Sequence, residues 1–535
     1  FFDTLLTWLW NRLYNGIELN GIRQAKDLAQ SHEIVYIPCH RSHIDYLLLS
    51  YVLYHNGLTP PHIAAGRNLN LPVIGPLLRR AGAFYMRRSF QGDTLYKEIF
   101  DEYLHQMFTR GFSIEYFIEG GRSRTGRTLP PRTGMLSMTV KSFQKDSTKP
   151  IALLPVYFGY ERVLESSTYR AELSGSRKRS ESLFDVFKIF SSFKHDFGQV
   201  TVNFGEPMLL KEFLDEELNG WTDTAQVSTS DLAKSCNDLA QQLATNINNS
   251  VAIKATNLVA LALLSTDRQS IDEEHLTKQV QLLRQIAAGC GYPGFSLAEA
   301  SVEEIIDEAT NIIGLSRTEH QFGTIVSASP DQAVSMTYNA NNVLHVYALP
   351  SLLSRLVRTN KQAERRELLD FVSDLYPFLK AEMFLPWSQA ELGAITEQIL
   401  DCLVQLNIIS ARDRQLDAPP PASFEYNCLK DLSSITDPTL ERFYIVIALL
   451  EYFPGMSQGE LENAASGIAA QLSALYGINS PDFFEKSLFS TFLNTLNDCE
   501  SATVSTLEPS VARTLDPDVR HNILQAVKHV GGQAR

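Results

Sequence analysis

Short apolar segments alternate with helical patterns between residues 31 and about 225, and this alternation constrains the fold more than any other feature of the chain. Strands that alternate with helices are typical of α/β domains, which have a central sheet and a functional site at the strand ends. We therefore expect a central mixed sheet flanked by helices. The expected strands are 33–39, 61–65, 83–86, 112–118, 150–158 and 199–204, and the expected helices are 43–55, 93–110 and 134–144.

The rest of the 535-residue chain has a different pattern, and its length alone predicts two or more domains. Residues 1–30 look helical and amphipathic. Beyond residue 226 helical periodicity dominates, as in 232–247 and 276–288, and a Pro-rich stretch at 418–422 predicts a turn. We therefore expect three parts: an interfacial helical segment (1–30), an α/β domain (31–225) and a mainly helical region (226–535) whose role the sequence does not reveal.

The first expected strand runs into His40-Arg-Ser-His-Ile-Asp45, which places an imidazole and a carboxylate five positions apart. On one helix these side chains would point about 140° apart. They can meet only if His40 precedes a helix and Asp45 lies in its first turn, with Ser42 as the N-cap of a capping box. A His held by an Asp is half of a catalytic triad, and it can activate a hydroxyl that the substrate supplies.

Other interpretations of this segment remain open on its residues alone. Asp45 could be only a helix cap, and His40 only a turn residue. A metal site built from His40, His43 and Asp45 is a third possibility, but no distant Cys, His and Glu cluster completes it. Further segments are needed to decide between these interpretations.

A second segment combines glycine with arginine after an apolar strand: Glu119-Gly-Gly-Arg-Ser-Arg-Thr-Gly-Arg127. Such a loop allows close backbone approach and offers forked donors for a phosphate dianion. Residues 121–128 are one residue from a Walker A loop, with Arg127 in place of the Lys. The prolines at 130–131 block the helix into which a P-loop must open. The loop therefore predicts a phosphate site without a nucleotide P-loop, and a solvated basic loop is the alternative.

Local charge supports an anionic ligand. Residues 67–132 hold 11 Lys and Arg against 6 Asp and Glu, a balance of +5, whereas the whole chain has 47 against 61 and a net charge of −14. A second arginine pair, Arg87 and Arg88, follows the strand expected at 83–86. A basic island in an acidic chain favours a small phosphate-bearing substrate over nucleic acid, which needs a broad basic face.

Four ordered segments carry a resemblance to a known family. They are residues 40–45, 82–88 (Gly-Ala-Phe-Tyr-Met-Arg-Arg), 117–124 (Phe-Ile-Glu-Gly-Gly-Arg-Ser-Arg) and 154–160 (Leu-Pro-Val-Tyr-Phe-Gly-Tyr). In order and spacing they resemble the four blocks of the glycerolipid acyltransferases. Within that superfamily the chain is most similar to the large bacterial membrane-bound glycerol-3-phosphate acyltransferases, and the similarity continues into the C-terminal half.

This resemblance implies an enzyme. It would transfer a fatty acyl group from acyl-carrier protein or coenzyme A to the sn-1 hydroxyl of glycerol 3-phosphate, giving 1-acyl-sn-glycerol 3-phosphate, the first step of phospholipid synthesis. Residues 31–225 would be the acyltransferase domain, with His40 as general base and Asp45 orienting it. We expect no metal, no organic cofactor and no nucleic acid partner. An acyltransferase for dihydroxyacetone phosphate or 1-acylglycerol 3-phosphate, a nucleotide-dependent phosphotransferase and a non-catalytic lipid-binding protein are the alternatives.

The same blocks imply a set of substrate-binding residues. The third block supplies the phosphate ligands Arg122, Ser123 and Arg124 and two residues that shape their loop. The second block supplies an arginine pair, and the fourth supplies Pro155, which the family associates with the acyl donor. A proline inside a strand usually marks an edge or a bulge. The implied residues are Arg87, Arg88, Glu119, Gly120, Arg122, Ser123, Arg124 and Pro155.

Membrane attachment is expected at the cytoplasmic face of the bacterial inner membrane, as a peripheral or monotopic protein in contact with phospholipid. The sequence has no run of 18 uninterrupted apolar residues that predicts a spanning helix. Residues 1–14 are rich in Phe, Leu and Trp, and Trp8 and Trp10 suit a membrane interface, with a buried helix as the alternative.

Two further features concern the compartment and the acyl donor. The basic run at 175–179 is a candidate docking loop for an acidic acyl-carrier protein. The six cysteines have no CxxC spacing and fit free thiols in a reducing compartment. The chain begins at Phe1, and we expect the proteins it resembles to extend further at the N-terminus.

Overall fold

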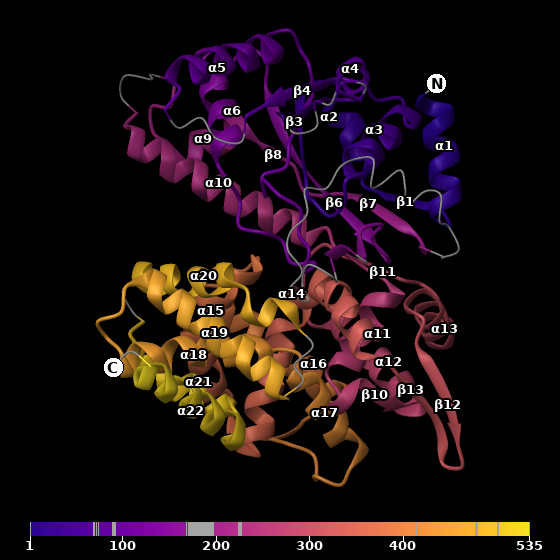
Figure 1. Ribbon diagram of the computed structural model, residues 1–535, viewed down its shortest axis with the longest axis vertical. Coiled ribbons are helices and arrows are strands. Elements are labelled where there is room, and N and C mark those ends of the chain that lie inside the picture. The colour runs from indigo at the N-terminus through magenta and orange to yellow at the C-terminus, as the bar shows by residue number, and fades with distance from the viewer. Residues whose placement is uncertain are drawn as a thin grey trace.

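The computed structural model describes residues 2–67, 70, 72, 74–87, 92–166, 168–169, 197–222, 227–413, 415–476, 480–499 and 502–533. In Figure 1 the chain up to helix α10 (Thr229–Asn249) forms the upper half of the molecule. The chain from helix α11 (Ala255–Leu264) onward forms the lower half.

An eight-stranded mixed sheet forms the centre of the upper half, which confirms the expected fold class. The strand order is β1-β7-β6-β2-β5-β3-β4, and β8 also pairs with β6. Strand β6 pairs antiparallel with β7 and β8, and the other neighbours are parallel. The strands are β1 (Ile17–Asn20), β2 (Glu33–Pro38), β3 (His62–Gly66), β4 (Ala83–Met86), β5 (Ile114–Glu115), β6 (Ile151–Tyr160), β7 (Val200–Phe204) and β8 (Met208–Leu209).

Strand β6 lies inside the sheet, so Pro155 does not mark a sheet edge, one of the two usual places for a strand proline. All ten residues of β6 are buried, which explains its continuous apolar sequence. The Pro155 carbonyl accepts a hydrogen bond from the Gly205 N–H at 2.9 Å. In a strand the N–H of a residue points to the same side as its carbonyl, and here that side faces the turn between β7 and β8. Proline has no N–H, and at Pro155 that group would point to the turn between β7 and β8, where the neighbouring strand is interrupted.

Two other sequence predictions need correction. The strand expected at 112–118 is reduced to Ile114–Glu115, because the residues after it turn toward the His40 segment. Residues 1–30 are not helical throughout, since β1 (Ile17–Asn20) separates two helices and pairs with β7. The alternating Ile-Glu-Leu-Asn sequence of β1 is the local signal for this strand.

Helices cover the sheet on both sides. In Figure 1 helix α1 lies to the right of the sheet and α3 above β6 and β7, whereas α5, α6, α9 and α10 are grouped to its left. The helices expected at 43–55, 93–110 and 134–144 are present with ends shifted by two residues or fewer. The helices before α10 are α1 (Phe2–Leu13), α2 (Ile22–Leu28), α3 (Asp45–His55), α4 (Ile74–Arg80), α5 (Thr94–Thr109), α6 (Gly134–Lys145) and α9 (Leu210–Glu217).

The lower half is mainly helical, as expected. Helix α14 (Pro330–Asn360) runs through its centre and is buried along most of its 31 residues. The Pro-rich stretch at 418–422 connects β16 to α17, as the sequence predicts. The other helices are α12 (Glu273–Gly289), α13 (Val302–Ile313), α15 (Arg365–Met383), α16 (Leu392–Gln405), α17 (Phe424–Ser434), α18 (Asp437–Tyr452), α19 (Gln458–Tyr476), α20 (Lys486–Asp498), α21 (Val504–Thr514) and α22 (Pro517–Gln533).

Small sheets complete the lower half, and the two halves share one continuous hydrophobic core. Within the described ranges, no helix is long and apolar enough to cross a bilayer. The short strands are β9 (Ala252–Ile253), β10 (Ser270–Asp272), β11 (Ser296–Leu297), β12 (Ser316–His320), β13 (Gly323–Ser327), β14 (Gln362–Glu364), β15 (Ser410–Arg412) and β16 (Gln415–Asp417).

Candidate active site

The two predicted catalytic side chains meet between β2 and α3. His40 lies in the turn that follows β2, and Asp45 is the first residue of α3. The Nδ1 atom of His40 is 2.9 Å from Oδ2 of Asp45. The hydroxyl of Tyr160, the last residue of β6, donates to the other carboxylate oxygen at 2.7 Å. The turn therefore brings together the imidazole and the carboxylate, as the five-residue spacing requires.

The predicted N-cap role of Ser42 is wrong. The N-cap residue of α3 is Ile44, and the Ser42 hydroxyl donates instead to Oε2 of Glu165 at 2.8 Å. Half of the capping box is present, because Oδ2 of Asp45 accepts the backbone N–H of Ser42 at 2.9 Å. The same oxygen accepts the N–H of Arg41 at 2.7 Å. The Glu165 carboxylate is a stronger acceptor for the Ser42 hydroxyl than a neutral oxygen is. Asp45 is held instead by the two backbone N–H groups.

The surroundings of His40 favour a neutral imidazole. Its ring stacks on Phe117 with 4.0 Å between ring centroids, and its side chain is only 17% exposed. Burial lowers the pKa of His40 below its ordinary range, although the neighbouring Asp45 acts to raise it. Because Nδ1 faces Asp45, Nε2 is the atom left to accept a proton from a substrate.

Glu119, Gly120 and Ser123 shape the backbone around His40. Glu119 is buried, and its two oxygens accept the N–H groups of His40 at 2.8 Å and Leu129 at 2.9 Å. The Ser123 N–H donates to the His40 carbonyl at 2.9 Å. Gly120 has a φ of +65°, and a Cβ there would lie 2.6 Å from the Arg132 side chain. These contacts hold the third-block loop against the His40 turn.

The two predicted phosphate arginines occupy different environments. The Arg122 side chain is 10% exposed, donates to the Tyr169 hydroxyl at 3.0 Å and lies 3.5 Å from Oε1 of Glu165. The Arg124 side chain is half-buried and lines a cavity. Its guanidinium lies 5.8 Å from the centre of the Tyr169 ring. Of the two arginines, Arg124 is the better placed to meet a ligand.

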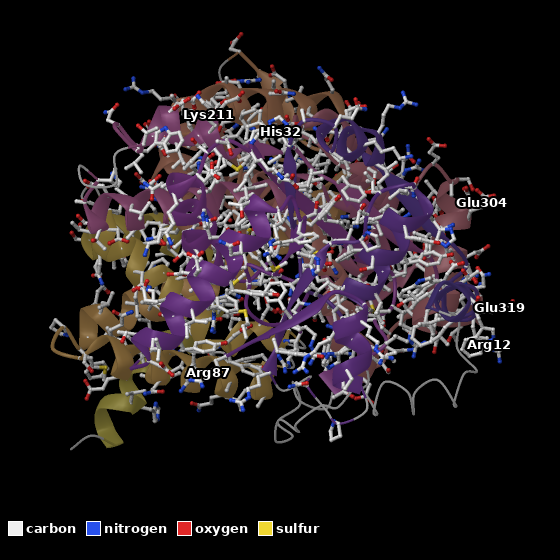
Figure 2. All side chains as sticks on the ribbon, turned by 90° about the horizontal axis from the view of Figure 1, so that it is seen from above. Arg12, His32, Arg87, Lys211, Glu304 and Glu319 are labelled. Atoms are coloured by element: carbon white, nitrogen blue, oxygen red, sulfur yellow. The ribbon has the colours of Figure 1, made fainter. Side chains whose placement is uncertain are left out.

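Of the three further predicted residues, the two that the structure describes lie apart from this cluster. Arg87 lies at the surface in Figure 2, pairs with Asp93 at 2.6 Å and lies over the Tyr96 ring. Arg88 lies outside the described residues. Pro155 is enclosed in β6, and it is not among the residues that line the two cavities described below. Their binding roles stay predictions.

An apolar cavity of about 430 Å³ opens beside the catalytic pair. It is formed by α1, α3, β3, α4 and the turns near them, and His40 and Phe117 lie in its wall. We call it the apolar cavity; its apolar lining includes Leu6, Leu47, Ile63, Ala64 and Leu78. The imidazole of His40 therefore borders a largely apolar space.

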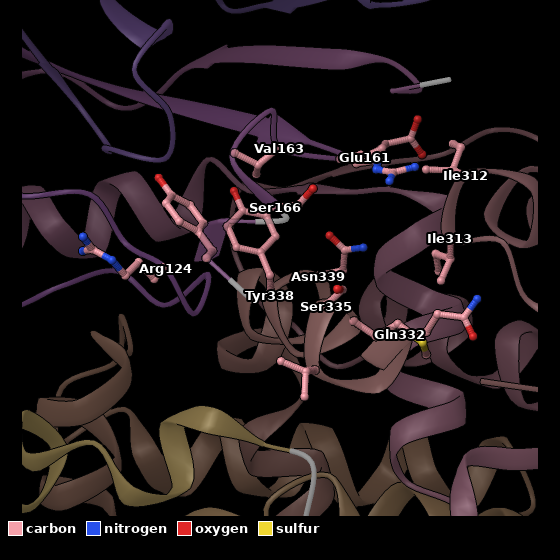
Figure 3. Close-up of a pocket in the computed structure, with 14 residues that line it drawn as sticks. Arg124, Glu161, Val163, Ser166, Ile312, Ile313, Gln332, Ser335, Tyr338 and Asn339 are labelled. Atoms are coloured by element: carbon pink, nitrogen blue, oxygen red, sulfur yellow. The ribbon is translucent and has the colours of Figure 1, made fainter. Parts of the chain in front are cut away.

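A second cavity, of about 130 Å³, lies between the upper and lower halves (Figure 3). The upper half contributes Arg124 together with residues that follow β6. The lower half contributes the end of α13 and the first turns of α14. We call it the polar cavity; its polar lining is Arg124, Glu161, Arg162, Ser166, Tyr169, Gln332, Ser335, Tyr338 and Asn339.

Sequence reasoning missed the role of Arg127. Its guanidinium is buried and pairs with Asp482 at 2.6 Å and with Glu382 at 2.9 Å, both in the lower half. Arg442 also pairs with Glu382. Arg127, which stands where a Walker A loop has its lysine, thus anchors the helical region. No local signal could reveal partners that lie 255 and 355 residues away along the chain.

Arg41, between the catalytic His and Ser42, was also missed. It is 1% exposed, and its guanidinium donates to the Arg127 carbonyl at 2.9 Å and the Thr128 hydroxyl at 3.2 Å. The Thr128 hydroxyl donates in turn to Asn248 of α10 at 2.6 Å. Arg41 therefore connects the turn that carries His40 to the loop that continues from the third block. Within the described part of the chain, no group of three or more His, Cys, Asp or Glu residues is placed to hold a metal ion.

Comparisons with known proteins place the chain. Residues 21–159 match the family described as Acyltransferase, which gives the class of the domain that carries the His40 turn. Residues 169–504 match the Glycerol-3-phosphate acyltransferase C-terminal region. The chain belongs to the glycerol-3-phosphate acyltransferase family.

Curated relatives support this assignment. The chain is 48% identical over 504 residues to the glycerol-3-phosphate acyltransferase of Pseudomonas aeruginosa strain LESB58, covering 93% of this chain and 60% of that protein. It is 46% identical over 506 residues to that of Pseudomonas fluorescens strain Pf0-1, covering 94% and 61%. The chain thus spans about 60% of the length of these relatives.

A solved structure, the 1-acyl-sn-glycerophosphate acyltransferase of Thermotoga maritima, is 17% identical to the chain with a TM-score of 0.27. That match covers 46% of this chain and 75% of the other, and a similarity at this level supports no structural argument.

Proposed function

We propose that the protein transfers a fatty acyl group from a thioester to the sn-1 hydroxyl of glycerol 3-phosphate. The observation that carries the proposal is the His40–Asp45 pair, 2.9 Å apart, in the wall of the apolar cavity. An enzyme that joins an acyl chain to an alcohol needs a base beside a hydrocarbon site. The family membership and the arginines of the third block support an acceptor that carries a phosphate.

The reaction follows from the geometry of the pair. Nε2 of His40 removes the proton of the acceptor hydroxyl as its oxygen attacks the thioester carbonyl. Asp45 stabilises the imidazolium that forms and fixes the tautomer. Collapse of the tetrahedral intermediate breaks the carbon–sulfur bond, and the thiolate takes the proton back from His40. The products are 1-acyl-sn-glycerol 3-phosphate and the free thiol of the carrier.

Attack by the acceptor itself is favoured over an acyl-enzyme route. Cys39 is the nearest thiol in the chain, but it is buried, and burial raises its pKa to about 12. Its sulfur also accepts a hydrogen bond from the Phe158 N–H at 3.1 Å. The Ser42 hydroxyl is bound to Glu165. A nucleophile needs an activated, accessible oxygen or sulfur, and neither side chain offers one.

The apolar cavity supports a site for the acyl chain. An acyl chain gains about 0.8 kcal/mol for each buried methylene group, so an apolar wall can bind it without directional contacts. With the chain in this cavity, its thioester carbonyl would lie at His40. We propose acyl-carrier protein and coenzyme A thioesters as donors. The basic run at 175–179, our predicted carrier-protein dock, lies outside the described residues.

We also propose attachment to the cytoplasmic face of the inner membrane. Exposed apolar side chains lie on several helices of the upper half, including Trp8 (56% exposed) of α1 and Leu95 and Ile99 of α5. Trp10 is 2% exposed and packs against Tyr51, so its predicted place at the interface is wrong. Of the two tryptophans, Trp8 alone therefore supports attachment to the membrane.

One assay tests the proposed function directly. Purified protein in phospholipid vesicles is given labelled glycerol 3-phosphate with palmitoyl-coenzyme A or palmitoyl-carrier protein. We expect labelled 1-acyl-sn-glycerol 3-phosphate, and less product from dihydroxyacetone phosphate or 1-acylglycerol 3-phosphate at equal concentration. Faster acylation of either competing acceptor would overturn the proposed substrate, and no acylation of any of the three would overturn the proposed reaction.

A further inference from the structure

The two oxygens of the Asp45 carboxylate are bound by different parts of the chain. Asp45 is fully buried, and its Oδ2 atom lies 2.9 Å from Nδ1 of His40. The same oxygen accepts the backbone N–H groups of Arg41 and Ser42 at 2.7 and 2.9 Å. Its Oδ1 atom accepts the hydroxyl of Tyr160 at 2.7 Å. The catalytic turn itself thus supplies the contacts at Oδ2, whereas the donor at Oδ1 lies 115 residues further along the chain, at the end of β6.

Packing fixes the direction in which the Tyr160 hydroxyl points. Tyr160 is buried, and its ring lies 5.9 Å from the Tyr14 ring and 6.4 Å from the Phe158 ring, measured between centroids. Its backbone is held in the sheet opposite Val200 of β7. Because a tyrosine side chain has only two torsions, these contacts leave the hydroxyl aimed at Oδ1 of Asp45. A phenylalanine at this position would keep the ring contacts and lose only the hydroxyl.

The Tyr160 hydroxyl keeps its proton. Burial, and after it the negative charge of Asp45, raise the pKa of the phenol well above its ordinary value. A hydrogen-bond donor stabilises a carboxylate and reduces the attraction that this carboxylate exerts on a neighbouring proton. Asp45 therefore attracts a proton on the His40 imidazole less strongly than the same carboxylate would with Oδ1 unbound.

A general base at His40 requires two things of Asp45. The base has to be neutral before it accepts a proton, and it has to present the correct nitrogen. Burial lowers the pKa of His40, and the contact with Asp45 acts in the opposite direction. A hydroxyl that weakens the attraction of Asp45 favours the neutral imidazole. The same hydroxyl opposes rotation of the carboxylate, so that Oδ2 continues to face Nδ1 and Nε2 is left for the substrate.

We propose that Tyr160 is a positioning residue for the catalytic pair: its hydroxyl holds the Asp45 carboxylate in the orientation that serves His40 and moderates its attraction for the imidazole proton. The proposal rests on the proposed function, because it takes His40 as the base of that reaction. Tyr160 lines neither the apolar nor the polar cavity, so it acts through Asp45 and not on a substrate. The last residue of the fourth block thereby receives a role.

Other titratable and charged groups surround the pair, and they come from every element packed against it. They are Cys39, Arg41 and His43 of the turn, Tyr46 of α3, Tyr14 after α1, Glu115 of β5, Glu119 and Arg122 of the third-block loop, Glu165 and Tyr169 after β6, and Tyr338 of α14. Replacing Tyr160 with phenylalanine leaves all of these groups in place. A difference in titration between the two proteins is therefore assigned to the hydroxyl.

The test compares Tyr160→Phe with the wild-type protein in the acyl-transfer assay. We expect kcat to fall about tenfold, the value of one hydrogen bond to a charged group, while the KM values for glycerol 3-phosphate and the thioester stay close to the wild type. We also expect the acid midpoint of the kcat/KM profile to rise by about half a unit, a fraction of the roughly 1–3 units that an adjacent opposite charge produces. The phosphate of the acceptor titrates equally with both proteins, so it does not contribute to this difference.

Tyr116→Phe is the matched control. Tyr116 directly follows β5 of the same sheet, is also buried, and its hydroxyl lies 3.2 Å from the Thr139 hydroxyl of α6. The control variant also loses a buried tyrosine hydroxyl, so its melting temperature reports the effect of that loss on the fold. We expect its kcat and acid midpoint to match the wild type. A midpoint in Tyr160→Phe that is unmoved or lower, an equal rise in Tyr116→Phe, or a change in KM alone overturns the proposal.

A second measurement needs no turnover. In protein that carries isotope-labelled histidine, the NMR signal of the His40 ring, identified by its absence in His40→Ala, reports the protonation of this side chain. We expect its midpoint to rise by the same amount in Tyr160→Phe. A rise in this titration, together with a wild-type protein that acylates no acceptor, would uphold the role of Tyr160 at the pair and refute the proposed function. An unchanged titration in an active enzyme would refute the role of Tyr160 and leave the proposed function intact.

Discussion

The apolar and polar cavities both lie near the catalytic turn, the first through His40 and the second through Tyr169, but they are built in different ways. The apolar cavity is formed by side chains between residues 3 and 117 alone. The polar cavity needs side chains from two parts of the chain, residues 124–169 and 312–339. The apolar cavity is thus local to the acyltransferase domain, whereas the polar cavity is shared with the helical region.

The difference has a physical reason. A hydrocarbon site needs only apolar walls, which the strands and helices around β3 already bury. A phosphate site needs cations held at fixed positions against their own desolvation cost, and this requires rigid support. The lower half supplies that support through Asn341 at Thr125 and through the buried pairs of Arg127.

The largest effect is expected for His40, which lies in the wall of the apolar cavity. His40→Ala removes the base, and turnover should fall by about 10²- to 10⁴-fold, since general-base catalysis contributes this much. Circular dichroism and the melting temperature should stay close to the wild type. A variant that keeps more than about a tenth of the activity would exclude a general-base role of this size.

The next prediction concerns the link between the halves. Asp482→Asn removes one of the two carboxylates that pair with the buried Arg127, leaving Glu382, and should cost about 3–5 kcal/mol of unfolding free energy. Burial raises the pKa of Asp482, but Arg127 and Arg442 outweigh it and hold the pKa at about 2, so the carboxylate is charged at neutral pH. Urea denaturation measures the loss. Glu274→Gln, in the exposed pair with Lys278, is the control and should leave the midpoint nearly unchanged.

A smaller effect distinguishes the two third-block arginines. Arg124→Ala should raise the KM for glycerol 3-phosphate by about tenfold to a hundredfold, the value of one charge-assisted contact. Arg124→Lys should not restore it fully, because an ammonium cannot fork onto two oxygens. Arg122→Ala should act mainly on stability, because Arg122 is bound to Glu165 and Tyr169. Equal KM changes in both variants would show that the two arginines do not differ in this way.

The smallest effect concerns pH. Because burial lowers the pKa of His40, the imidazole stays neutral to lower pH than a free histidine. It loses its ability to accept a proton only below that pKa, so kcat/KM should fall on the acid side with a midpoint below about 6.5. His43 has a pKa lowered to about 4 by burial and then by Arg122, so it could contribute to the same fall. The midpoint should persist in His43→Asn, and a midpoint above about 6.5 would contradict the assignment.

The sequence was sufficient where the signal is local. The alternation of apolar and helical segments predicted the sheet, and the five-residue spacing between His40 and Asp45 required the turn that the structure has. These features depend on neighbours along the chain. The contact of the Asp45 carboxylate with the Ser42 backbone N–H was also within reach of the pattern, although the partner of the Ser42 hydroxyl was not.

What the sequence could not predict depends on distant packing. Trp8 and Trp10 look alike in the sequence, but only the fold decides that Trp10 is buried. The sequence predicts Arg127 as part of a basic phosphate loop, but its side chain pairs with Glu382 and Asp482, which lie hundreds of residues away along the chain. Likewise, no pattern in the first 225 residues indicates that α14 would line a cavity with Arg124.

The central claim is that two separate cavities near one His–Asp pair hold the two substrates. It is tested by measuring both KM values in Arg124→Ala and in Ala64→Phe, which fills the apolar cavity from β3. An acyl thioester of N-acetylcysteamine, which carries no phosphate, serves as donor. We expect Arg124→Ala to raise only the KM for glycerol 3-phosphate, and Ala64→Phe to raise only the KM for long-chain thioesters. Variants that change both KM values equally, or in the reverse pattern, would contradict the account.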